Sequence, residues 1–237
     1  MKPERLRARL EELSTRGGLP RAHFKYLRWL KRKMRFEPRV VYDIGASLLH
    51  WTAGVRELWP DAEVILFDAF EPAGFLYEGH RHWLGVLSDR DGREVNWYQN
   101  ELYPAGNSCY RELAGAKGDL FPVGTHIVRQ ARTLDSIVRE YGFPPPDLVK
   151  IDVQGGERDV MVGGAATLRS ARRLIVEMQH EVCNDGAPVA ADTLPWIESQ
   201  DWYCDAPLFS SNGGDGDYGF VRPDDLKPGS RPRFTPD

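Results

Sequence analysis

The sequence contains no long hydrophobic run and few cysteines. No stretch approaches the roughly 18 consecutive apolar residues of a membrane-spanning helix, and the first residues lack the apolar core of a secretion signal. The three cysteines, Cys109, Cys183 and Cys204, are far apart and form no CxxC pair, which argues against a disulfide framework or a zinc site. These absences predict a cytoplasmic protein with no membrane span and no bound metal.

Two glycine-rich nucleotide motifs are absent as well. The sequence contains neither GxGxxG after a strand nor GxxxxGK[ST], so neither a dinucleotide pyrophosphate cradle nor a P-loop is expected. A nicotinamide-dependent oxidoreductase is therefore the least favoured enzyme class. A ligand that carries a ribose without a phosphate remains compatible with the sequence.

The composition is that of a soluble globular protein with an uneven distribution of charge. The chain has 237 residues, of which 41% are hydrophobic and 28% are charged, which fits one α/β domain. Residues 1–36 carry twelve Lys or Arg against three Glu, although the whole chain has a net charge of −4. This basic segment could contact phosphate groups or an anionic membrane surface, or mediate a homodimer, or it could simply be the solvated face of two helices.

Alternating strand-like and helix-like segments follow this basic extension. We expect helices at residues 3–14 and 20–35, a core domain over residues 37–223 and a proline-rich, disordered tail over residues 224–237. Residues 100–126 are expected to form a loop. The expected strands are "RVVYDIGA", "AEVILFDAF", "WLGVLSD", "DLVKID", "RRLIVEMQ", "WYCDAPLF" and "DYGFVRP", with "REVNWYQ" as an extra strand.

This alternation predicts a mostly parallel sheet covered by helices on both faces. The last two strands have no helix between them, so one strand should be antiparallel. Ligands of such sheets bind at the carboxyl ends of the strands, and four expected strands end in acids: Asp43, Asp68, Asp89 and Asp152. Acidic side chains there suit a cationic nucleoside, and S-adenosylmethionine has both a ribose and positive charges.

Several segments, in the same order, resemble the FkbM-type methyltransferases, which have the class I S-adenosylmethionine-dependent, Rossmann-like fold. The segments are "VVYDIGAS", "VILFDAFEP", "GVLSDRDG", "ARTLDSIV", "LVKIDVQGGERDVMVGGAATL" and "LIVEMQH", and the most specific is "KIDVQGGE". The resemblance implies a seven-stranded sheet. It also implies methyl transfer to a hydroxyl of a sugar, glycan or natural product.

The resemblance also implies roles for single residues around the cofactor. Asp43, Gly45 and Ala46 would line its methionine part, with Ser47 in the same loop. Asp68 would bind the ribose, although Glu71 is an alternative. Ser88 and Asp89 would lie near the adenine, and Asp152 would face the methyl donor.

Catalysis at a hydroxyl needs a general base within hydrogen-bond reach of the acceptor. His180 and Asp152 are the candidates, since both follow strands that should end at the site. A divalent ion held by Asp152, His180 and Glu181 is an alternative route. Asn107 and Ser108 lie in a polar loop that could bind a polyhydroxylated acceptor, and Lys150 with Glu177 could form a buried ion pair.

Two other functions remain open at this point. Leu49 and Gln154 depart from the family pattern, which allows a non-catalytic S-adenosylmethionine-binding or regulatory protein. The basic N-terminus allows a nucleic-acid methyltransferase, but no Asn-Pro-Pro-Tyr-type motif follows the fourth strand. We therefore do not expect a nucleic acid as partner.

Overall fold

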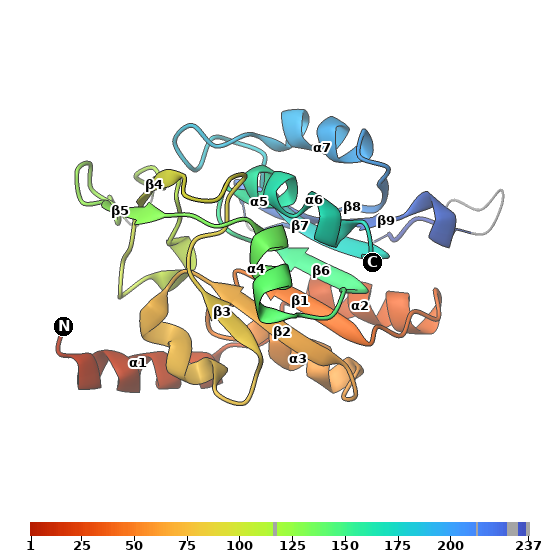
Figure 1. Ribbon diagram of the computed structural model, residues 1–237, viewed down its shortest axis with the longest axis horizontal. Helices are drawn as coiled ribbons and strands as arrows, with labels where there is room; N and C mark the ends of the chain where they lie inside the picture. Colours follow the sequence, from red (N-terminus) through yellow and green to blue (C-terminus); the bar gives the residue numbers. More distant parts are fainter. Residues whose placement is uncertain (116–117, 212, 227–231, 236–237) are drawn as a thin grey trace.

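The computed structural model describes residues 1–115, 118–211, 213–226 and 232–235. A seven-stranded sheet in the order β3-β2-β1-β6-β7-β9-β8 forms the centre of the molecule (Figure 1). β9 is antiparallel to both of its neighbours, while the other paired strands are parallel. This arrangement confirms the predicted class I methyltransferase sheet and its closing antiparallel strand.

The strands of this sheet are short and apolar, as buried parallel strands are. Their bounds are β1 Val40–Ile44, β2 Glu63–Asp68, β3 His82–Leu84, β6 Leu148–Ile151, β7 Arg173–Gln179, β8 Tyr203–Ser211 and β9 Asp215–Val221. In β1, Val41 faces one hydrophobic core, whereas Tyr42 and Ile44 face the other. The alternation of side chains along each strand therefore divides the interior into two apolar layers.

Helices cover both faces of the sheet. α1 (Pro3–Arg16), α2 (Arg21–Arg32) and α3 (His50–Leu58) pack on one face, and α4 (Leu134–Tyr141), α5 (Glu157–Gly163), α6 (Ala165–Leu168) and α7 (Ala190–Glu198) on the other. α4 begins where the Thr133 hydroxyl accepts the backbone N–H of Ser136, and it ends at Gly142 with φ +59°. Both are ordinary helix-terminal signals. Within the described ranges, no helix is long and apolar enough to cross a bilayer.

The basic N-terminal helices share the core of the sheet. Leu6 and Leu10 of α1 are buried, as are Leu27 and Leu30 of α2. Their apolar stripes therefore face the body of the protein, as their spacing predicts. The 3-10 helix η1 (Glu71–Tyr77) packs against α1.

A buried ion pair fastens α2 to the far edge of the sheet. Arg173 of β7 lies 2.7 Å from Asp205 of β8, with both side chains at most 4% exposed. The Tyr26 hydroxyl of α2 donates to the same carboxylate at 2.9 Å. The backbone N–H of Phe234 donates to the Asp205 carbonyl at 2.7 Å, and the Phe234 ring packs against Tyr26 and Trp29.

The structure departs from the sequence-based prediction in three regions. The expected strand "WLGVLSD" is limited to β3, which ends at Leu84, so Asp89 does not end a strand. Residues 127–130, to which no strand was assigned, form β5 (Ile127–Gln130), which pairs with β4 (Glu94–Trp97) in a separate two-stranded sheet. The helix expected over "GERDVMVGGAATLRSA" is divided between α5 and α6 at Gly163 and Gly164. Of the predicted disordered tail, residues 227–231 and 236–237 lie outside the described residues.

We predict that replacing Asp205 with Ala lowers the free energy of unfolding by about 3–5 kcal/mol, because the Arg173 charge would stay buried without its partner. Urea unfolding followed by circular dichroism measures the change. Asp225→Ala is the matched control, since Asp225 pairs with the half-exposed Arg172 at 2.9 Å; this change should cost under about 1 kcal/mol. An equal loss of unfolding free energy in the two variants would contradict the stabilising role assigned to the buried Arg173–Asp205 pair.

Candidate functional site

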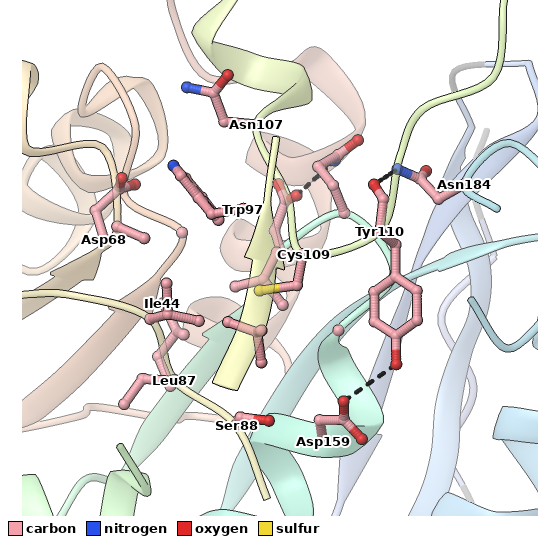
Figure 2. A pocket seen from close by; sticks show the side chains of 18 of the residues that line it. Ile44, Asp68, Leu87, Ser88, Trp97, Asn107, Cys109, Tyr110, Asp159 and Asn184 are labelled. Atoms are coloured by element: carbon pink, nitrogen blue, oxygen red, sulfur yellow. Dashed lines mark hydrogen bonds between the residues drawn. The ribbon is translucent and has the colours of Figure 1, made fainter. Parts of the chain in front are cut away.

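A cavity of about 600 Å³ opens at the carboxyl ends of β1, β2, β6 and β7 (Figure 2). Along the order of the strands it reaches from Asp68, at the end of β2, to Glu177 on β7 and Asp215 on β9, and Ser88 lines it as well. Its volume lies within the range of small-molecule sites. Of the residues assigned to the cofactor from the sequence, those on its wall are Gly45, Ser47, Asp68, Ser88 and Asp152.

The loop after β1 is pressed against the end of β6. A Cβ at Gly45 would lie 1.7 Å from the carbonyl oxygen of Asp152, and Gly45 has φ +84°. Ser47 and Leu49 also have left-handed conformations, with φ +44° and +65°. Only glycine fits at position 45, because both the lack of space and the backbone angle exclude a side chain there.

Asp68 fixes this loop from the end of β2. Its carboxylate accepts the backbone N–H groups of Ser47 and Phe70, each at 2.7 Å. Burial raises the pKa of Asp68, although these hydrogen bonds oppose the shift. The alternative acid Glu71 does not line the cavity; its side chain is 66% exposed and lies 3.5 Å from Arg129.

Asp43 and Ala46 are buried beneath the cavity wall. The Asp43 carboxylate accepts the Thr52 hydroxyl at 2.6 Å through one oxygen, and its other oxygen has no hydrogen-bond partner. Burial raises the pKa of Asp43, while the nearby Lys150 ammonium opposes the change. Neither Asp43 nor Ala46 is on the cavity wall.

A buried lysine organises the carboxylates at the end of β6. The Lys150 ammonium lies 2.6 Å from one oxygen of Asp152, and the Gln154 amide donates to the other at 2.9 Å. Gln154 also donates to the carboxylate of Glu177. The expected pairing of Lys150 with Glu177 is therefore wrong: the ion pair forms with Asp152, two residues along the same chain segment.

The two carboxyl groups of this cluster differ in acidity. Burial would raise the pKa of Asp152, but the Lys150 charge and hydrogen bonds from its neighbours lower it. Burial raises the pKa of Glu177, and the adjacent Asp152 charge raises it further. Asp152 is thus the ionised member of the pair, and Glu177 is the member that retains a proton to higher pH.

The end of the cavity near Ser88 is shaped by close packing and by one arginine. A Cβ at Gly163 would lie 2.0 Å from the Ser88 carbonyl oxygen, which explains the glycine where α5 ends. Asp89 does not line the cavity; it pairs with Arg93 at 2.7 Å. Arg93 also lies 3.2 Å from Asp159, so its charge is already balanced.

The two residues of the polar loop that were predicted to bind the acceptor have different positions. Asn107 is on the cavity wall and its side-chain oxygen accepts the backbone N–H of Asn100 at 2.6 Å. Ser108 is fully buried, and its hydroxyl donates to the Gln154 carbonyl at 2.7 Å. Ser108 therefore anchors the loop to the end of β6 and does not face the cavity.

His180 does not reach the cavity wall. Its Nδ1 lies 3.3 Å from the Tyr218 hydroxyl, and its Nε2 is buried without a partner. The described residues contain no group of His, Cys, Asp and Glu arranged to hold a metal ion. Asp152, His180 and Glu181 are thus not gathered around a common point.

The sequence analysis did not predict several of the residues that line the cavity. Figure 2 shows Tyr110 reaching Asp159, where its hydroxyl donates at 3.1 Å, while Trp97 and Glu112 border the same space. Glu177, which the sequence analysis considered only as a partner of Lys150, also lines the cavity; its signal was a charge inside the apolar run "RRLIVEMQ". Glu112 offered none, because it lies in an irregular loop.

The wall fits a cationic nucleoside better than a phosphorylated ligand. Ile44, Phe67 and Leu87 supply apolar surface for a base, and carboxylates flank it. The cavity wall contains a single Arg or Lys among the described residues, Arg93, and that group is paired twice. S-adenosylmethionine therefore fits the residues present.

The family model for the methyltransferase FkbM domain matches residues 43–202, more than half of the chain. Among curated proteins, the chain is 25% identical over 215 residues to the 2-O-methyltransferase NoeI of Sinorhizobium fredii. That match covers 81% of this chain and 86% of NoeI. The chain is also 26% identical over 196 residues to the AMB antimetabolite synthetase AmbE of Pseudomonas aeruginosa. That match covers 65% of this chain and 9% of AmbE.

Solved structures with a related arrangement include the precorrin-6y C5,15-methyltransferase of Geobacter metallireducens. The TM-score is 0.41 at 14% identity, over 80% of this chain and 83% of the other. Human N-acetylserotonin methyltransferase gives a TM-score of 0.41 at 8% identity, over 84% and 55% of the two chains.

We predict that Asp68→Asn weakens S-adenosylmethionine binding by roughly 1–3 kcal/mol, because a charged hydrogen-bond acceptor is lost at the cavity wall. Isothermal titration measures the affinity. Glu71→Gln is the control, since Glu71 is exposed and off the wall, and it should bind like the wild type. An unchanged affinity for Asp68→Asn, or an equal loss in the control, would remove Asp68 from the ribose site.

Proposed function

The chain belongs to the FkbM methyltransferase family, and from this premise we propose that it methylates a hydroxyl oxygen on a sugar, glycan or natural product. S-adenosylmethionine is the methyl donor of this family. The observation that carries the proposal is the cavity of about 600 Å³ whose wall includes Asp68 and Ser88, assigned to the nucleoside, together with the polar residues Asn107 and Glu177. The similarity to a 2-O-methyltransferase supports oxygen as the acceptor atom.

The residues that would hold the cofactor come from three neighbouring strand ends. Gly45 and Ser47 present backbone at the end of β1, Asp68 presents a carboxylate at the end of β2, and Asp152 presents another at the end of β6. When bound, the cofactor supplies an electrophilic methyl group on a positively charged sulfur. Carboxylates near that charge stabilise it, whereas they would repel a phosphate.

The acceptor hydroxyl must lose its proton as the new bond forms. We assign the proton acceptor to Asp152, acting in a hydrogen-bonded group with Gln154 and Glu177. Lys150 keeps Asp152 ionised and in place. Asp152 lines the cavity, and a general base must stand where it can contact the acceptor.

The two departures from the family pattern are compatible with catalysis. Leu49 has φ +65°, a conformation that glycine adopts more readily. Gln154 connects the two carboxylates next to the cavity. A non-catalytic binding protein would have no need for this arrangement. We therefore rank the non-catalytic function below the methyltransferase function.

Asp152→Asn should lower kcat about 10²–10⁴-fold, the usual contribution of a general base. Production of S-adenosylhomocysteine, measured against a panel of sugars and hydroxylated natural products, gives the rate. His180→Ala is the matched comparison, because His180 lies outside the cavity wall; its kcat should stay within about threefold, which corresponds to under 1 kcal/mol in the barrier.

Thermal unfolding of both variants separates lost chemistry from lost structure, since Asp152→Asn also deprives Lys150 of its partner. A large loss of kcat in His180→Ala with Asp152→Asn unaffected would transfer the role to His180. Cofactor binding without turnover on any acceptor would favour the non-catalytic alternative.

A further inference from the structure

The turn between β6 and α5 holds a glutamine in an unusual backbone conformation. Gln154 has φ +57°, in the left-handed region that residues with a side chain seldom adopt. From this position its side-chain amide donates to two carboxyl groups of the cavity wall, Asp152 at 2.9 Å and Glu177. Because glutamine does not prefer this conformation by itself, other contacts of the protein must hold the turn in place.

Glu157, the first residue of α5, grips the two residues that flank Gln154. One carboxylate oxygen accepts the backbone N–H of Val153 at 2.9 Å, and both oxygens accept that of Gly155 at 3.1 Å. Glu157 is buried and does not line the 600 Å³ cavity. Its carboxylate therefore acts on the cavity only through the turn that carries Gln154.

The loop predicted to bind the acceptor holds the carbonyl side of the same turn. The Ser108 hydroxyl lies 2.7 Å from the carbonyl oxygen of Gln154 and 3.2 Å from that of Val153. A hydroxyl with one proton can serve these carbonyl oxygens but leaves the N–H groups of the turn to another partner. Those N–H groups depend on Glu157.

The Glu157 carboxyl group titrates near neutral pH. Burial raises its pKa to about 7 against the opposing backbone N–H groups, and the Asp152 charge adds to the rise. Glu177 and Asp215 border a small space beside Glu157, and burial raises the pKa of both. Asp152 stays ionised over this range, because Lys150 outweighs burial and holds the pKa of Asp152 low.

Protonation of Glu157 would loosen its hold on the turn. A protonated carboxyl oxygen becomes a donor, so it no longer accepts the N–H of Gly155. The hydrogen bonds that remain join neutral groups and are roughly half as strong as those to a carboxylate. Gln154 could then relax from its left-handed conformation, and Asp152 would lose the amide that orients one of its oxygens.

We propose that Glu157 is a positioning residue for methyl transfer, which holds the Gln154 amide against Asp152 while ionised and releases it on taking up a proton. This inference rests on the proposed O-methyltransferase function. The proton of the acceptor hydroxyl still passes to Asp152, and Glu157 takes no part in that transfer. The rate of methyl transfer should therefore fall as the pH is lowered through neutrality.

The effect of Glu157 on folding has the opposite sign. The folded state raises the pKa of this group above that of an unfolded glutamate, so its contribution to stability is fully present below the unfolded pKa. That contribution is lost as the pH rises through about 7. A purely structural role would therefore weaken the protein at high pH, whereas lost positioning lowers the rate at low pH.

The side-chain amide of Gln154 tests the inference without turnover. Its ¹⁵N–¹H NMR signals, identified by their loss in Gln154→Leu, are followed from about pH 5.5 to about pH 9 with the protein saturated by S-adenosylhomocysteine. In the wild type they should shift in a transition with a midpoint near pH 7. Glu157→Gln should abolish this transition, because glutamine does not ionise. Asp159→Asn is the matched control, since Asp159 is the other acid in the first turn of α5, and it should retain the transition.

The pH dependence of kcat tests the consequence for the reaction. The wild type should lose at least about threefold in kcat between about pH 8 and about pH 6. Glu157→Gln should be roughly threefold to tenfold slower at the higher pH and show no further decline. Its KM for S-adenosylmethionine should stay within about twofold of the wild type, because Glu157 is off the cavity wall. The decline should persist in His180→Ala, which removes a side chain of the type that usually titrates in this range.

A Gln154 signal that does not move in the wild type, or a transition that survives in Glu157→Gln, would overturn the inference. A rate decline that disappears in His180→Ala would do the same. If Glu157→Gln fails to bind S-adenosylhomocysteine, Glu157→Asp takes its place: its shorter side chain should lower kcat, and an unchanged kcat would count against positioning. Failure of the O-methyltransferase function has a different signature, namely no S-adenosylhomocysteine formation with any acceptor while the Gln154 transition is still observed.

Discussion

A buried ammonium group allows the carboxyl ends of the central strands to carry so many acids. Lys150 is 5% exposed and lies on β6 between β1 and β7. Its charge contacts Asp152 directly and also interacts with Asp43 and Asp217, each of which raises the pKa of Lys150. Without this cation, several carboxylates would share a region of low dielectric, and each would have to take up a proton. The site at the sheet edge depends on that one charge.

The same edge connects the N-terminal helices with the site. His23 of α2 lies 2.8 Å from Asp217 of β9, and both side chains are almost fully buried. Asp217 in turn faces Glu177 across the β7–β9 pair. The helices that carry the basic surface are thus part of the structure behind the cavity wall. Their apolar faces complete a core layer, and the segment is not an independent module.

The cavity combines two kinds of wall with different origins. The end proposed for the cofactor is made by strand ends and by one tight loop, in which Gly45 has no room for a side chain. The end proposed for the acceptor is made by β9 and by a loop that Ser108 fastens to the end of β6. A rigid sheet with loops above it lets the chemistry stay fixed while the acceptor surface varies.

The sequence by itself determined the sheet, its single antiparallel strand and the acids at the ends of β1, β2 and β6. Local patterns suffice there, because alternating apolar strands and helices allow few arrangements and the carboxyl ends of parallel strands meet at one edge. Only the tertiary structure decided that Lys150 pairs with Asp152 and not with Glu177, that Asp89 is occupied by Arg93, and that β5 pairs with β4. It also decided that Glu112 and Asp215 line the same cavity. These features bring together residues far apart in the chain, and sequence spacing contains no information about such contacts.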